Sequence, residues 1–129
     1  MKSFVKKYAE TLLASLASFF APLVGLLTTT GALVLADLVT GVWAAKKRGE
    51  AISSRKMGKT VSKCIGYYLA ILLGHLVEST FHTAIPVANV TAGMIATVEF
   101  KSNMENLKTI TGVDFTMLLQ TLINKNRGL

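Results

Sequence analysis

Asp37 is the side chain with the clearest chemical potential in this chain, because it is the only formal charge between residues 12 and 45. An aspartate inside a membrane helix costs about 2.5 to 3.5 kcal/mol on insertion scales, so it should face a partner or water and not lipid. Thr40, Gly41 and Ala44 share its helical face. We therefore expect these four residues to form an assembly face or a pore-lining face. The alternative is an aspartate that is simply solvated at a membrane boundary.

A second polar group consists of His75, Glu78, Ser79 and His82, which fall on one helical face. His75, Glu78 and His82 could supply metal ligands, but a polar edge at the membrane interface is the favoured interpretation. No nucleophile, phosphate loop or carboxylate pair occurs in a context that catalysis needs. The single cysteine, Cys64, excludes an intramolecular disulfide and is interpreted as a small apolar residue. We therefore predict no enzyme, no cofactor and no metal site.

The composition is typical of an integral membrane protein. Apolar residues make up 51% of the 129 residues and charged residues 16%, whereas soluble domains usually carry about 25% charged residues. Mean hydropathy is +0.49. The basic start MKSFVKKYAE resembles a signal peptide, but the apolar run after it is too long and lacks a clear cleavage site. We predict one all-α membrane domain over residues 1–129.

Apolar segments separated by turns predict four transmembrane helices. A turn is expected at Thr28–Gly31, from its hydroxyl residues and glycine, and another at 82–86, where Pro86 suits a helix start. Three crossings are the alternative, with the first two segments fused into one long helix kinked near Pro22. A short amphipathic helix is expected over 113–127, where apolar residues recur at helical spacing. The four predicted membrane helices are about 8–27, 32–45, 64–81 and 86–100.

A basic loop is expected between the second and third segments, over residues 46–63. The positive-inside rule places this loop in the cytoplasm, and the net charge of +7 then reflects loops that face anionic lipid. A nucleic-acid partner is disfavoured because the cations lack interleaved aromatic residues. Four crossings would put both termini on the same side as the loop, whereas three would leave the basic N-terminus outside. The loop cations are Lys46, Lys47, Arg48, Arg55, Lys56, Lys59 and Lys63.

Small residues recur at every fourth position in each apolar segment. This spacing lets helix backbones approach closely in lipid, where van der Waals packing is the main attraction. We therefore predict a homo-oligomer, and the alternative is that these faces pack only within one chain. The expected helix-packing residues are Ala17, Ala21, Gly25, Gly66, Ala70, Gly74, Ala88 and Ala92.

The segment DLVTGVWAAKKRGEAISSRKMGK, from Asp37 to Lys59, resembles the signature of the toxin-secretion/phage-lysis holin family. The resemblance continues to residue 107 and departs from the family near the C-terminus, where Gly112 comes one residue late and no proline follows. The matching positions are Asp37, Thr40, Gly41, Ala44, Gly49, Ser53, Ser54, Lys63, Glu99, Glu105, Asn106 and Leu107.

This resemblance implies a holin, a small protein that assembles in the bacterial cytoplasmic (inner) membrane and permeabilises it. Its functional partner would be an endolysin, as in phage lysis of a host cell, or a secreted toxin. A small oligomeric ion channel or transporter would also use short helices and one membrane acid. A structural or accessory membrane subunit, or an antiholin, is a further alternative.

Overall fold

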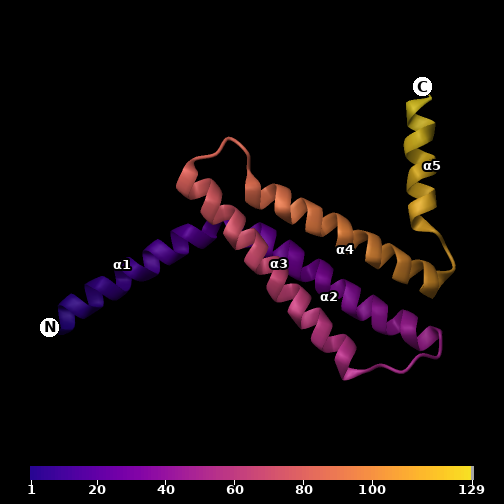
Figure 1. The fold of residues 1–129 in the computed structure, drawn as a ribbon, viewed down its shortest axis with the longest axis horizontal. Helices are drawn as coiled ribbons and strands as arrows, with labels where there is room; N and C mark the ends of the chain where they lie inside the picture. Colours follow the sequence, from indigo (N-terminus) through magenta and orange to yellow (C-terminus); the bar gives the residue numbers. More distant parts are fainter. Residues whose placement is uncertain (129) are drawn as a thin grey trace.

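The computed structural model describes residues 1–128 and is all-α over that range, as predicted. The chain forms three helices that pack together, flanked by one helix at each end (Figure 1). The elements are α1 (Lys2–Phe20), the 3₁₀ turn η1 (Ala21–Leu23), α2 (Val24–Lys47), α3 (Ser54–Phe81), α4 (Val87–Thr111) and α5 (Phe115–Arg127).

Helices α2, α3 and α4 form the bundle that positions the candidate site. α4 packs against both other helices, and its contact with α2 is the most extensive. Figure 1 shows α4 and α2 side by side, with α3 crossing them, while α1 extends away from one end and α5 turns away at the other. The loop after α2, the start of α3 and the end of α4 therefore meet at one end of the bundle, which we call the basic end.

The expected turn at Thr28–Gly31 is wrong, because α2 runs through it without a break. In an apolar environment a turn would leave backbone groups unpaired, whereas a helix satisfies them all internally. The interruption falls instead at Ala21–Leu23, where Pro22 lacks the N–H that a regular helix needs. This is the geometry of the fused helix that was considered as the alternative. It leaves the N-terminus far from the basic end (Figure 1).

The connections at the basic end are shorter than predicted. The expected loop over 46–63 is wrong at both edges, because α2 continues to Lys47 and α3 begins at Ser54. Gly49 adopts φ +74°, and the N–H groups of Gly49 and Glu50 bond back to Lys46 and Ala45. This pattern is a glycine helix stop that ends α2. Residues 55–63, which were expected in the loop, belong to α3.

The opposite end of the bundle has the second expected turn. α3 ends at Phe81, and α4 begins at Val87 directly after Pro86. His82 takes the left-handed conformation, with φ 48°, and ends α3. The prediction of a turn over 82–86 is confirmed, and α4 extends to Thr111, well beyond the expected end near residue 100.

The buried core is small and the apolar surface is large. The core cluster contains Leu23, Ile71 and Ile95 with two alanines of α4. Two helical units are long and apolar enough to cross a membrane, Lys2–Lys47 and Ser54–Phe81, and only 17% and 11% of their most apolar windows are buried. Soluble proteins bury such helices, so these surfaces fit a lipid environment. The number of membrane crossings stays a prediction.

The small residues divide into two groups. Gly74 lies against α4 so closely that a Cβ there would be 3.2 Å from the backbone nitrogen of Ala88, and Ala88 and Ala92 are buried. Packing within one chain therefore accounts for the small residues at the contact between α3 and α4. The remaining predicted packing positions are exposed in the single chain, apart from half-buried Ala70: Ala17, Ala21, Gly25 and Gly66.

Candidate functional site

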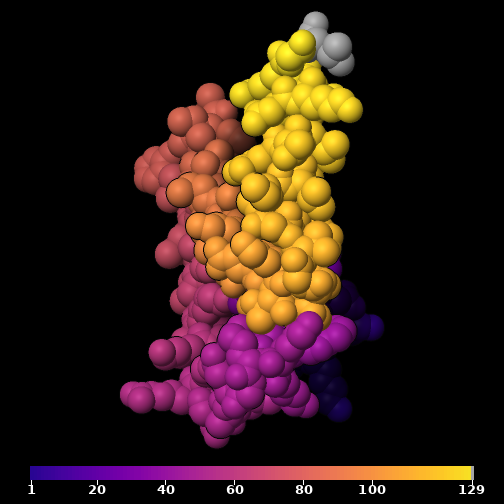
Figure 2. Space-filling model, turned by 90° about the vertical axis from the view of Figure 1, so that its right-hand side faces the viewer, coloured from indigo at the N-terminus to yellow at the C-terminus, as the bar shows by residue number. Residues whose placement is uncertain are grey.

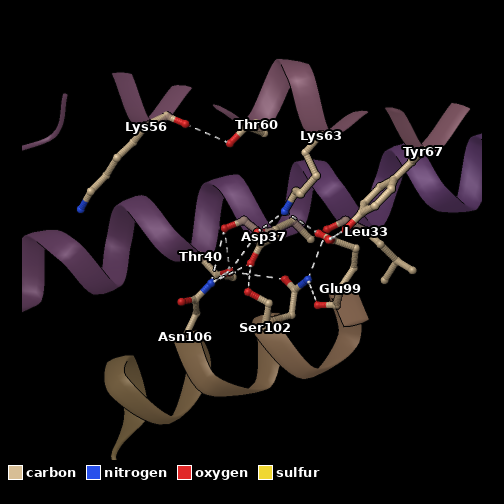
Figure 3. Close-up of polar contacts among 12 residues, drawn as sticks. Leu33, Asp37, Thr40, Lys56, Thr60, Lys63, Tyr67, Glu99, Ser102 and Asn106 are labelled. Carbon is tan, nitrogen blue, oxygen red and sulfur yellow. Dashed lines mark hydrogen bonds and ion pairs between the residues drawn. The ribbon is translucent and has the colours of Figure 1, made fainter. Parts of the chain in front are cut away.

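A polar network lies inside the three-helix bundle, where α2, α3 and α4 meet (Figure 3). It joins residues that are far apart in the sequence into one set of hydrogen bonds and ion pairs. Buried polar groups need such partners, since an unpaired group in an apolar interior is costly. The members of this polar network are Asp37 and Thr40 from α2, Lys63 and Tyr67 from α3, and Glu99, Ser102, Asn103 and Asn106 from α4.

Lys63 is the centre of the network. Its Nζ lies 2.9 Å from Asp37 Oδ2 and 2.9 Å from Glu99 Oε2, so one ammonium group serves two carboxylates. The Glu99 side chain is 1% exposed and that of Asp37 15%, whereas the Lys63 side chain is 30% exposed. Tyr67 donates a hydrogen bond to the other Glu99 oxygen at 2.8 Å. The ion pairs therefore tie α3 to both neighbouring helices.

Asp37 is fully engaged by the chain itself. Ser102 Oγ donates to Asp37 Oδ1 at 2.6 Å, and Asn106 Nδ2 donates to the same oxygen at 3.0 Å. With Lys63 on the second oxygen, the carboxylate has three partners from two helices. Such pairing offsets part of the insertion penalty that an isolated aspartate would carry.

The face predicted around Asp37 packs against α4. Thr40 accepts a hydrogen bond from Asn106 at 3.1 Å and lies 3.3 Å from the side-chain oxygen of Asn103. A Cβ on Gly41 would come within 3.5 Å of Asn106, and Ala44 is 0% exposed. All four residues of the face thus lie together in a contact within the chain, and their role in assembly or a pore stays a prediction.

A pocket of about 250 Å³ extends from the network toward the basic end. Asp37, Ser102 and Asn106 line one part of it, and Arg48 and Lys56 line another. Apolar side chains such as Leu38, Val42 and Ile52 complete the lining. The polar groups present and a volume of this size allow the pocket to hold several water molecules. The carboxylate of Asp37 therefore borders a space that water can occupy, although the rest of the bundle around it is apolar.

The basic end carries a small exposed ion cluster. Glu50 accepts two hydrogen bonds from Arg48, at 2.7 and 3.1 Å, and lies 3.4 Å from Lys56 Nζ. The hydrogen bonds from Arg48 and then the charge of that guanidinium lower the Glu50 pKa to about 2. The remaining predicted loop cations are exposed on α2 and α3: Lys46, Lys47, Arg55 and Lys59. Lys47 also donates to the carbonyl of Ile110 at the end of α4.

Other matching positions have structural explanations outside the network. Gly49 ends α2, and Ser53 precedes the first residue of α3, Ser54. Glu105 is exposed and lies 4.0 Å from Lys101. Of the three consecutive matching positions Glu105, Asn106 and Leu107, only Asn106 therefore belongs to the network.

Tyr67, Ser102 and Asn103 were not expected to take part in a site. The available signal was a polar stripe on α4, since Glu99, Ser102, Asn103 and Asn106 recur at spacings of three, four and seven. The first half of α4 is apolar, and the polar stripe begins in its second half. Such a stripe must face a partner or water.

The histidine group is only partly assembled. His75 Nδ1 lies 3.0 Å from Glu78, whose other oxygen accepts the N–H of Ala88 at 3.1 Å and so caps α4. His82 lies in the following turn and is exposed. Among residues 1–128, no group of three or more His, Cys, Asp or Glu side chains is placed to hold a metal ion.

These features define a class: a small helical membrane protein that closes a charged network within its own bundle. A family model described as the bacteriophage holin family matches residues 14–126, which is most of the chain. The chain therefore belongs to the bacteriophage holin family, in agreement with the resemblance of its motifs. Neither the curated proteins nor the solved structures contain a significant match.

Membership in this family makes the chain a holin-type membrane protein. The family consists of membrane proteins that are not enzymes, and membrane association and oligomerisation are family properties. The family match includes α2, α3 and α4 completely and hence every member of the polar network.

Proposed function

We propose that this protein assembles in the bacterial cytoplasmic membrane and opens a lesion through which an endolysin or a toxin passes. The observation that carries the proposal is the polar network within an otherwise apolar bundle, since Lys63 lies 2.9 Å from each of two carboxylates. Such a network is costly to keep in lipid and favourable to expose to water. It thus provides one chain with both a closed and an open surface.

The closed conformation is the one in which α4 covers the Asp37 face. There the network charges are paired, Ala44 is fully buried, and the exposed surfaces of α1, α2 and α3 are largely apolar between their charged ends. A chain in this state is compatible with lipid on its outside. It can therefore accumulate in the membrane without permeabilising it.

The open conformation would separate α4 from α2. Separation would expose Asp37, Thr40 and Asn106 on two helices, and water would replace the hydrogen bonds between them. The pocket that already borders Asp37 gives water a starting point at the basic end. Several copies that open together would line a lesion with this polar face. The polar second half of α4, from Glu99 onward, would face the same lesion.

Orientation follows from the cations at the basic end. Lys46, Lys47, Arg48 and the basic first turns of α3 would lie in the cytoplasm, where the positive-inside rule places them. The protein would then cross the inner membrane more than once, with α2 and α3 as spanning helices.

The test is induced expression in a bacterium together with a cytoplasmic endolysin that has no export signal. Culture turbidity is followed through time, with each protein also expressed alone. Abrupt lysis that needs both proteins would show passage of a folded enzyme. Continued growth, with the protein verified in the membrane, would refute the proposal and favour a channel, an accessory subunit or an antiholin.

Asp37→Leu tests the role of the polar face in the same assay. Loss of the carboxylate removes the contacts to Lys63, Ser102 and Asn106, so lysis should shift in time or disappear. Val39→Leu is the matched control, because Val39 is 57% exposed on the opposite side of the same helix. Lysis of the Asp37→Leu variant on the unmodified schedule would show that the face has no such role.

A further inference from the structure

α5 has two chemically different faces and lies outside the bundle. Its large apolar side chains are exposed, with Leu122 at 59% and Ile123 at 54%. The other side of the helix carries Gln120, Asn124 and Arg127, together with exposed Met117. Amphipathic helices of this kind, with cations beside an apolar face, bind in the plane of a membrane surface. The apolar face consists of Phe115, Leu118, Leu119, Leu122 and Ile123.

The junction between α4 and α5 fixes the direction of α5. Gly112 has φ +76° and ends α4, a conformation that glycine adopts at little cost. Asp114 then caps α5 by accepting the N–H of Met117 at 3.0 Å, and its other oxygen lies 2.6 Å from Lys108 Nζ. One carboxylate therefore both starts α5 and ties it to the last turn of α4.

This junction sets α5 transverse to α4 at the basic end, pointing away from α2 and α3 (Figure 1). In Figure 1, α5 turns sharply away from α4 and runs transverse to the length of the bundle. Figure 2 looks at that end and shows α5 rising past the end of α4, with the region around the α2–α3 loop at the opposite edge. A helix transverse to spanning helices lies roughly parallel to the membrane plane.

We propose that α5 is a membrane-surface helix that inserts its apolar face into the lipid leaflet at the basic end and binds anionic lipid through its cations. Lys125 and Arg127 lie in its last turn, and the ends of α2 and α3 carry further positive charge at the same end of the bundle. Negative headgroups complement this charge. The occupant of the apolar face is therefore lipid.

A second copy of the chain is the competing occupant, and the residue types disfavour it. Helices that pack together in lipid use small residues at the contact, as Gly74 and Ala88 do here. The apolar face of α5 is built instead from phenylalanine, leucine and isoleucine. Large flexible side chains of this kind partition into acyl chains.

The test uses the full-length protein with Cys64 replaced by alanine and one new cysteine in α5. Leu122→Cys places an environment-sensitive fluorophore on the apolar face, and Asn124→Cys places it on the polar face as the matched control. The proteins are reconstituted in vesicles of phosphatidylcholine with phosphatidylglycerol. Quenching by lipids that carry a nitroxide on the acyl chain is then measured, so the readout does not depend on lysis.

The expected result is a blue-shifted emission and severalfold stronger quenching at position 122 than at position 124. Omission of phosphatidylglycerol should weaken the quenching at position 122. Equal quenching at the two positions would overturn the proposal. A label at position 122 that is shielded but unquenched, and that becomes exposed when the protein is diluted in lipid, would identify a second copy as the occupant. Leu118→Cys repeats the measurement if the first variant does not fold.

Discussion

Replacement of Lys63 by methionine should destabilise the bundle more than loss of any exposed cation. The change leaves Asp37 and the 1%-exposed Glu99 without their shared counterion, although Ser102 and Tyr67 still donate hydrogen bonds to them. Removal of one partner from a buried ion pair costs about 3 to 5 kcal/mol. Because Lys63 itself is 30% exposed, we expect the lower end, about 3 kcal/mol, which is roughly a hundredfold in the folding equilibrium.

The assay is reversible unfolding of the purified protein in mixed detergent micelles, followed by circular dichroism. Lys59→Met is the matched control, because Lys59 is exposed one turn earlier on the same helix. The double variant Lys63→Met/Glu99→Gln should be more stable than the sum of its single effects predicts, by about 1 kcal/mol or more, since a neutral amide needs no counterion. Equal stability of Lys63→Met and Lys59→Met would refute the reasoning.

Two further predictions concern helix packing and pH. Gly74→Ala should destabilise the protein by about 1 to 3 kcal/mol, because the new Cβ would meet the backbone of Ala88. Gly66→Ala is the control and should be neutral or stabilising, because a Cβ there meets nothing within 4 Å. Thermal unfolding midpoints in detergent compare the two variants. The hydrogen bond from Lys108 and then the hydrogen bond from the Met117 N–H contribute most to lowering the Asp114 pKa below its ordinary 3.8, and the charge of Lys108 adds to them. The contact between Lys108 and Asp114 is therefore fully present above pH 3.8 and is lost as the pH falls through the lowered Asp114 pKa. An NMR titration should show α5 loosening only at pH values below 3.8. Loosening near neutral pH would contradict this prediction.

The apolar pattern predicted the helical class and the amphipathic α5, but not the path of the N-terminal half. Thr28 to Gly31 have the residue types of a turn, and in water they would favour one. Within an apolar helix the same residues stay helical, because no solvent replaces the backbone hydrogen bonds. Pro22 was the reliable signal, since its missing N–H interrupts a helix in any solvent.

The candidate site was predictable from α2 alone only in part. Asp37 and its face stood out because a single acid in an apolar run needs a partner. Lys63 and Asn106 stood out only as positions of the family motif and not as partners of Asp37, because Lys63 looked like one more loop cation once the start of α3 was placed too late. Which side chains meet across helices depends on the rotation and depth of each helix, and periodicity within one helix does not contain that information.

The spacing of the polar network along the chain has a consequence for the order of synthesis. Under the proposed topology, α2 enters the membrane before the charged partner of Asp37 exists, because Lys63 follows Asp37 by 26 residues. Glu99, the second carboxylate that Lys63 contacts, follows Lys63 by another 36 residues. At roughly 5 to 20 residues per second, the lysine alone takes about 1 to 5 seconds to arrive. For that interval the aspartate is held in place only by the apolar residues around it. The long helix from α1 to α2 thus gives a nascent chain the means to keep an unpaired acid until the bundle can close.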